Sequence, residues 1–196
     1  MVVLLNILFD YLLVAFAMFF VLFFDYPRSI LLPIIKQMRI VKHRDDRYSV
    51  WFLFISDNIS LIISTGILVL GIGRLPGILL YIGIGMIISG LLLRQIAISA
   101  LGIFFAPTVR IIKNHKIITN GPYRYIRHPS YTGALLFLFG MAIASRYLEA
   151  ILITLVLAVP AYLYRIRVEE RSLILHAGGS YIRYMGSTKM LIPYLI

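Results

Sequence analysis

The sequence contains no cysteine among its 196 residues. Thiol catalysis, zinc–thiolate sites, iron–sulfur ligation and self-palmitoylation are therefore excluded, as is a disulfide-stapled secreted domain. Charged residues are also scarce, at 14% of the chain, whereas soluble domains carry about a quarter. An apolar fraction of 61% and a mean hydropathy of +0.93 exclude a disordered chain and a soluble nucleic-acid-binding domain. A net charge of +11 on such an apolar chain indicates a membrane protein with basic loops.

Five apolar segments are candidate membrane-spanning helices, since about 30 Å of hydrocarbon at about 1.5 Å per residue needs about 20 residues. A signal peptide is the alternative for the first segment, but a basic start and a small-residue cleavage site are missing. Only Ser145 and Arg146 separate the last two segments, which predicts a tight helical hairpin rather than one overlong helix. The predicted spans are 2–24, 50–72, 76–100, 130–144 and 147–164.

Lysine and arginine are unevenly distributed between the loops. Six lie in 25–49, five in 101–129 and five after the fifth span, whereas the loops on the other side hold only Arg74 and Arg146. Cytoplasmic loops of membrane proteins are enriched in these residues. The expected fold is therefore all-α, a polytopic bundle of about five transmembrane helices with its N-terminus outside and its C-terminus in the cytoplasm.

We expect residues 1–196 to form a single integral membrane domain. Residues 1–107 would supply three spans and a basic cytoplasmic loop, 25–49, which is a candidate interfacial helix. Residues 108–196 would form a second region that includes the hairpin. Small residues in the third span predict close helix packing. They are Gly77, Gly83, Gly85, Ser89 and Gly90.

Asp57 and Arg94 carry opposite charges and lie at similar depths inside predicted spans. Asp57 is ~10 Å from the cytoplasmic start of its helix and Arg94 is ~9 Å from the cytoplasmic end of its own. Charges within a span usually face the bundle interior and have partners, so these two are expected to pair. The pair could fix helix register or form the wall of a polar site, and the sequence leaves both interpretations open.

Polar groups gather in two stretches that flank the hairpin on the predicted cytoplasmic side, within 108–131 and 165–184. Gly121-Pro122 marks a turn, and Pro129 suits the first turn of the fourth helix. His128 would then lie beside a helix N-terminus, where free N–H groups favour an anion. Arg165 and Glu169 are four positions apart, which places them on one face of a helix.

Together the two stretches resemble the isoprenylcysteine carboxyl methyltransferase family. The motif R-H-P-S-Y-T-G at 127–133 carries the resemblance, with G-P-Y at 121–123 before it and Arg165 and Glu169-Glu170 after it. The tail is similar too, in Gly178, Tyr181, Tyr184, Ile192 and Pro193. The resemblance covers roughly residues 108 to 196, and the first three spans match only in being hydrophobic.

The resemblance implies an integral membrane enzyme that uses S-adenosyl-L-methionine, with residues 108–196 as the cofactor-binding region. It assigns Arg165 to the substrate side, as the catalytic residue that orients an acceptor carboxylate. The implied substrate is a lipid-modified small molecule or protein C-terminus beside membrane lipid, with no nucleic acid and no metal. The implied cofactor contacts are His115, Lys116, Ile117, Ile118, Tyr123, His128, Pro129, Ser130, Tyr131 and Glu169.

Other functions share parts of this pattern. A phospholipid amine methyltransferase would share the cofactor half of the site, but an amine acceptor favours a carboxylate rather than an arginine at the reaction centre. An NADPH-dependent membrane sterol-type reductase shares the C-terminal element but needs more room and more basic residues for its cofactor. A metal site from His115, His128 and Glu169, or a small channel or scaffold, is a further alternative. The natural acceptor and the oligomeric state stay open.

Overall fold

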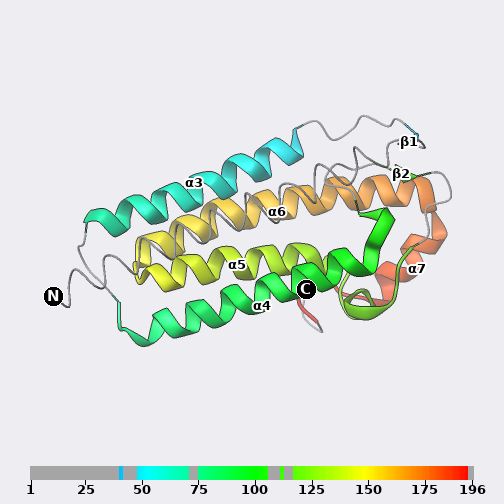
Figure 1. Ribbon diagram of the computed structural model, residues 1–196. Coiled ribbons are helices and arrows are strands. Elements are labelled where there is room, and N and C mark those ends of the chain that lie inside the picture. The colour runs from blue at the N-terminus through cyan, green and yellow to red at the C-terminus, as the bar shows by residue number, and fades with distance from the viewer. Residues whose placement is uncertain (1–39, 42–47, 71–74, 106–110, 113–116, 194–196) are drawn as a thin grey trace.

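The computed structural model describes residues 40–41, 48–70, 75–105, 111–112 and 117–193. Within these ranges the fold is helical, apart from a two-residue antiparallel strand pair, β1 and β2. Figure 1 shows the long helices side by side. The elements are β1 (Ile40–Val41), α3 (Ser49–Leu70), α4 (Ile78–Leu101), η3 (Gly102–Phe104), β2 (Ile111–Ile112), η4 (Gly121–Arg124), α5 (Pro129–Ser145), α6 (Leu148–Ala177) and α7 (Gly179–Ser187).

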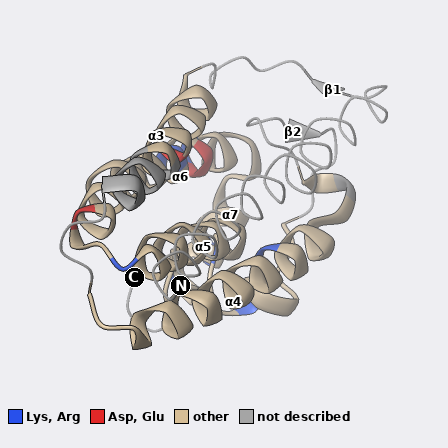
Figure 2. Ribbon diagram, turned by 60° about the vertical axis from the view of Figure 1, so that its left-hand side comes forward, with Lys and Arg blue, Asp and Glu red and all other residues tan. Residues whose placement is uncertain are grey.

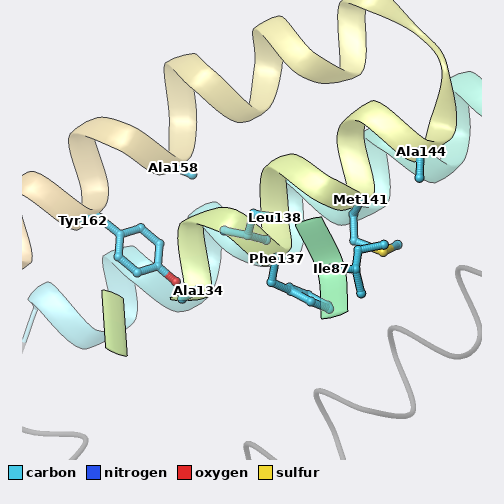
Figure 3. Packing of buried hydrophobic residues seen from close by; sticks show 8 residues of the cluster. All are labelled: Ile87, Ala134, Phe137, Leu138, Met141, Ala144, Ala158 and Tyr162. Atoms are coloured by element: carbon cyan, nitrogen blue, oxygen red, sulfur yellow. The ribbon is translucent and has the colours of Figure 1, made fainter. Parts of the chain in front are cut away.

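Helix α5 is central to the packing. It contacts α4 on one side and α6 on another, and α3 covers α6 and also contacts α5 (Figure 1). Figure 3 shows Ile87 of α4 beside Phe137 and Met141 of α5, whereas Ala158 and Tyr162 come from α6. One apolar cluster therefore joins three helices and fixes how their ends are placed relative to one another.

Glycines bring α4 and α5 into direct backbone contact. A Cβ at Gly90 would lie 2.6 Å from the carbonyl oxygen of Gly133, and one at Gly83 would lie 2.6 Å from that of Gly140. Such distances leave no room for a side chain, so the close packing predicted for Gly83 and Gly90 is confirmed. At Gly77 and Gly85 a Cβ would meet nothing within 4 Å among the described residues, so these two glycines take no part in the contact with α5.

The predicted hairpin is confirmed. Helix α5 ends at Ser145 and α6 begins at Leu148, with Arg146 between them in the left-handed conformation at φ 66°. Arg146 also donates from Nε to the carbonyl oxygen of Leu75, and the Leu75 N–H donates back to the Arg146 carbonyl. These bonds attach the start of α4 to the hairpin turn.

The predicted spans 50–72, 76–100 and 130–144 coincide with α3, α4 and α5 to within two residues. The fifth, 147–164, coincides only with the first part of α6, which continues to Ala177. The apolar run stops at Arg165, but the following residues are still good helix formers. The first predicted span and the 25–49 loop, except for the helix start at Ser49, lie outside the described helices.

Among the described residues, α4 and α6 are long and apolar enough to cross a membrane, and α5 is a shorter apolar helix. Figure 2 shows how few charged residues interrupt the described helices, most of which are tan. Many of their large apolar side chains are exposed, including Ile88 and Leu92 of α4 and Val156 of α6. Apolar surface on this scale is what a lipid-facing helix presents.

Candidate active site

The polar side chains of the described region meet where the second half of α6 passes the start of α5. Helix α7 and the tail after it pack against the same end of the molecule, which lies to the right in Figure 1. The tail forms a parallel bridge between Ile126 and Lys189. Beyond it, Thr132 donates its hydroxyl to the carbonyl oxygen of Leu191 at 2.8 Å.

Pro129 is the first residue of α5, as predicted, and His128 is its N-cap residue. The imidazole of His128 is 4% exposed, and its Nε2 lies 3.1 Å from Oε1 of Glu170. The same carboxylate oxygen lies 2.7 Å from Nε of Arg127. Glu170 therefore binds two consecutive residues of the R-H-P motif and holds the start of α5 against α6.

A second hydrogen-bonded group is centred on Tyr131, in the first turn of α5. Tyr131 donates its hydroxyl to Oε2 of Glu169 at 2.6 Å, and the same hydroxyl accepts a bond from Nε of Arg165 at 3.0 Å. The Tyr131 ring stacks on His128, with 5.6 Å between ring centroids. One phenol therefore joins the two α6 residues that the sequence places on one helical face, and this shared face is confirmed.

Arg165 is only 1% exposed. Its Nη1 donates to the hydroxyl of Ser49, the first residue of α3, at 2.6 Å. The guanidinium is therefore held between α3 and α5 while its own backbone belongs to α6. In contrast, Arg167 and Arg171 on the same helix are exposed.

The two charged residues predicted to pair within the spans both have partners. Oδ2 of Asp57 accepts a 3.0 Å hydrogen bond from the hydroxyl of Tyr162 in α6. Arg94 donates from Nη1 to both the carbonyl and the hydroxyl oxygen of Ser130 at 3.2 Å. Arg94 therefore reaches the first turn of α5, beside the candidate site. A direct Asp57–Arg94 pair stays a prediction.

Tyr123 lies in η4, directly before the R-H-P motif, and is buried. Its carbonyl oxygen accepts a 2.6 Å hydrogen bond from the hydroxyl of Tyr184 in α7. Burial raises the pKa of Tyr123 well above its ordinary value, and the charge of Glu169 raises it further. Both effects extend the pH range over which this phenol stays neutral beyond that of an ordinary tyrosine.

The structure brings together most, but not all, of the predicted site. The following residues lie at or directly before the start of α5, or on the facing turns of α6: Tyr123, His128, Pro129, Ser130, Tyr131, Arg165 and Glu169. Ile117 and Ile118 are half-buried in the segment before η4. His115 and Lys116 lie outside the described residues. Within the described residues, no three His, Asp or Glu side chains are grouped as metal ligands, and the His115 part of that alternative lies outside them.

Two contributors to the site were not predicted from the sequence. Glu170 appeared only as a letter of the motif, although it is the residue that binds Arg127 and His128. No sequence pattern pointed to Ser49, because a single serine 116 positions before Arg165 belongs to no local motif.

The described helices, with a polar end built on the R-H-P motif, define a helical protein, as predicted, in which two helices are long and apolar enough to cross a membrane. The resemblance of the motifs to one family is confirmed as well: residues 83–175 match the model of the isoprenylcysteine carboxyl methyltransferase (ICMT) family. The match begins within α4 and ends near the end of α6, so it includes both halves of the candidate site.

Similar proteins bear names of the same kind. A probable protein-S-isoprenylcysteine O-methyltransferase of Oryza sativa subsp. indica is 33% identical over 118 residues, which are 59% of this chain and 61% of that protein. The protein-S-isoprenylcysteine O-methyltransferase of Schizosaccharomyces pombe is 31% identical over 115 residues, or 57% of this chain and 48% of that protein. The aligned region thus spans less than two thirds of these relatives' length.

A solved structure has a similar fold. It is described as the eukaryotic intramembrane Ras methyltransferase ICMT, and it superimposes with a TM-score of 0.61. The superposition covers 94% of this chain and 67% of that one at 23% sequence identity. The superposition is therefore longer than the motif region, 108–196, and at this identity it shows the fold alone.

Proposed function

We propose that this protein transfers the methyl group of S-adenosyl-L-methionine to the carboxylate of an isoprenylated cysteine, or of a similar lipid-linked acceptor, at the cytoplasmic face of a membrane. The observation that carries the proposal is the buried guanidinium of Arg165, connected to Glu169 through the hydroxyl of Tyr131. A guanidinium binds a carboxylate through two parallel N–H donors. A buried cation therefore suits an anionic acceptor better than an amine.

The residues at the start of α5 and on α6 fit the cofactor by their chemistry. Oε2 of Glu169 is bound by Tyr131, and Oε1 receives no hydrogen bond from the described residues, so it suits a ribose hydroxyl or an ammonium group. The first turn of α5, with Ser130 and Tyr131, offers the helix N-terminus that favours a carboxylate. Nε2 of His128 is occupied by Glu170, so a contact from this ring would use Nδ1 or the ring face. We assign the adenine side to His115, Lys116, Ile117 and Ile118, and the neighbouring wall to Tyr123 and Pro129.

When bound, the cofactor supplies an electrophilic methyl group on a sulfonium. Because the proposed acceptor is already an anion, no residue has to act as a general base. The task of Arg165 is to orient the acceptor carboxylate. The task of the packed helix ends is to exclude water, which would otherwise solvate both the sulfonium and the carboxylate. Alignment rather than proton transfer is the main contribution that we expect from the protein.

The proposed topology places this site at the membrane boundary. We propose five membrane-spanning helices in one integral membrane domain, with the N-terminus outside and Arg165 directly after the fifth span. Phe52 and Tyr164 lie near Ser49 and Arg165 in the sequence and are about half exposed. Their rings meet edge to face, with 6.1 Å between ring centroids. A lipid tail arriving from the bilayer would pass along these rings while the cofactor enters from the cytosol.

The test is methyl transfer in detergent or liposomes, with labelled S-adenosyl-L-methionine and N-acetyl-S-farnesyl-cysteine. Base-labile label in the product would establish a carboxyl methyl ester. Base-stable label on phosphatidylethanolamine would instead assign the protein to the phospholipid amine methyltransferases. Cofactor binding without transfer to either would refute the acceptor, and binding of NADPH in place of S-adenosyl-L-methionine would favour a reductase.

Two variants of α6 separate the proposed roles. Arg165→Ala should leave cofactor affinity intact and remove most of the transfer, whereas Glu169→Ala should weaken cofactor binding itself. Arg167→Ala and Glu149→Ala are matched controls, because both residues are exposed on the same helix. If both site variants bind and turn over like their controls, the assignment of the site is wrong.

A further inference from the structure

Ser49 lies outside the part of the chain that matches the family model, yet it contacts the candidate active site. It is the first residue of α3 and is 2% exposed. Its hydroxyl accepts a 2.6 Å hydrogen bond from Nη1 of Arg165. A helix from the N-terminal half of the chain thus reaches the residue that we propose as the orienting cation.

The contact with Ser49 complements the one with Tyr131. Arg165 donates from Nε to Tyr131 and from Nη1 to Ser49, so two different nitrogens of a planar group are bound to two different helices. Hydrogen bonds at two such nitrogens fix both the plane of the guanidinium and its rotation about the side-chain axis. With Arg165 only 1% exposed, water does not readily replace either partner.

We propose that Ser49 is a positioning residue for the acceptor carboxylate: its hydroxyl holds the Arg165 guanidinium in the orientation that binds the acceptor. Ser49 acts through Arg165 and makes no contact with the reacting atoms. This role rests on the proposed carboxyl methyl transfer. It also assigns α3 a part in the reaction, because a shift of α3 against α6 would turn the guanidinium.

The chain offers a closely matched control for Ser49→Ala. Ser60 lies on the same helix and is equally buried at 2%, but its hydroxyl has no hydrogen-bond partner among the described residues. Ser49→Ala should lower kcat/KM for N-acetyl-S-farnesyl-cysteine by roughly tenfold or more, as expected for a lost hydrogen bond to a charged group. The dissociation constant of S-adenosyl-L-methionine should stay unchanged, Ser60→Ala should behave like the wild type, and Ser49→Thr should restore most of the loss.

A binding measurement shows whether Ser49 acts through Arg165. The wild type should bind N-acetyl-S-farnesyl-cysteine more tightly than its methyl ester, and Ser49→Ala should reduce this preference. In an Arg165→Ala background, adding Ser49→Ala should change the preference no further.

Each outcome has a definite meaning. Equal kcat/KM for Ser49→Ala and Ser60→Ala, or an additional loss in the Arg165→Ala background, would overturn the positioning role while leaving the methyl transfer in place. A wild-type protein that forms no base-labile methyl ester would overturn the proposed function, and the role of Ser49 with it.

Discussion

Arg127 and Glu170 form an ion pair across 43 positions of sequence, with 2.7 Å between Nε and Oε1. The same guanidinium donates from Nη1 to the carbonyl oxygens of Met185 and Thr188. One arginine therefore connects α6, the segment before α5 and the end of α7. Because the Arg127 and Glu170 side chains are only 9% and 10% exposed, the loss of either one leaves a largely buried charge without its partner.

Glu170→Ala should therefore release the C-terminal tail and destabilise the protein. Removing one partner of a buried ion pair typically costs about 3–5 kcal/mol. The measurement is the thermal midpoint in detergent, together with the rate at which trypsin cleaves after Arg183 and Lys189. Glu149→Ala removes an exposed glutamate from the same helix and should change neither quantity. Tail cleavage in Glu170→Ala at the wild-type rate would contradict the role of the pair.

Local patterns in the sequence predicted the helices well. The ends of α3, α4 and α5 follow from apolar runs and from Pro129, whose ring suits the first turn of a helix. The end of α6 did not follow, because the apolar run stops at Arg165 although the backbone stays helical to Ala177. Hydropathy predicts where the membrane-embedded part of a helix ends. It does not predict where the helix itself ends.

The candidate site was predictable where it is local and unpredictable where it depends on packing. The four-residue spacing of Arg165 and Glu169 placed them on one face, and the R-H-P motif marked the start of α5. The contact between Ser49 and Arg165 depends on how α3 packs against α6, and this packing cannot be predicted from the spacing of residues in the sequence. For the same reason, the partners of Asp57 and Arg94 came only from the structure.

The hydroxyl of Tyr131 is the link between the two functional residues of α6, so Tyr131→Phe should impair transfer. The ring would keep its stacking on His128 and its edge contact with Tyr162, whereas Glu169 and Arg165 would lose their shared partner. Hydrogen bonds to charged groups contribute about 1.5–3 kcal/mol, so kcat/KM should fall by roughly 10- to 100-fold.

Steady-state kinetics and the thermal midpoint, measured on the same preparation, test this prediction. Tyr125→Phe is the control, since Tyr125 is 52% exposed and lies close by in the sequence. A Tyr131→Phe variant with the kcat/KM of the control would show that the link is dispensable.

Backbone contact between α4 and α5 predicts opposite results for two glycines of one helix. Gly90→Ala would place a Cβ 2.6 Å from the Gly133 carbonyl oxygen and should lower stability by about 1–3 kcal/mol, the usual cost of overpacking. The Cβ of Gly85→Ala would meet nothing within 4 Å in the described part of the chain, so this variant should be neutral or slightly stabilising, because alanine favours a helix over glycine. Thermal midpoints of the two variants provide the comparison. Equal midpoints would mean that the helices do not pack as closely as described.

Burial raises the pKa of Tyr184 to about 12, from an ordinary value near 10, and the charge of Arg127 opposes this only in part. The folded protein thus favours the neutral phenol, whose hydroxyl donates to the carbonyl oxygen of Tyr123. Stability from this group is fully present below pH 10 and is lost as the pH rises through about 12. Tyr184→Phe should therefore lower the thermal midpoint at pH 7, by an amount matching the roughly 1 kcal/mol of one hydrogen bond. Its midpoint should also fall less steeply than that of the wild type between about pH 10 and 12. Parallel declines of the two proteins over that range would show that Tyr184 does not titrate with the folding transition.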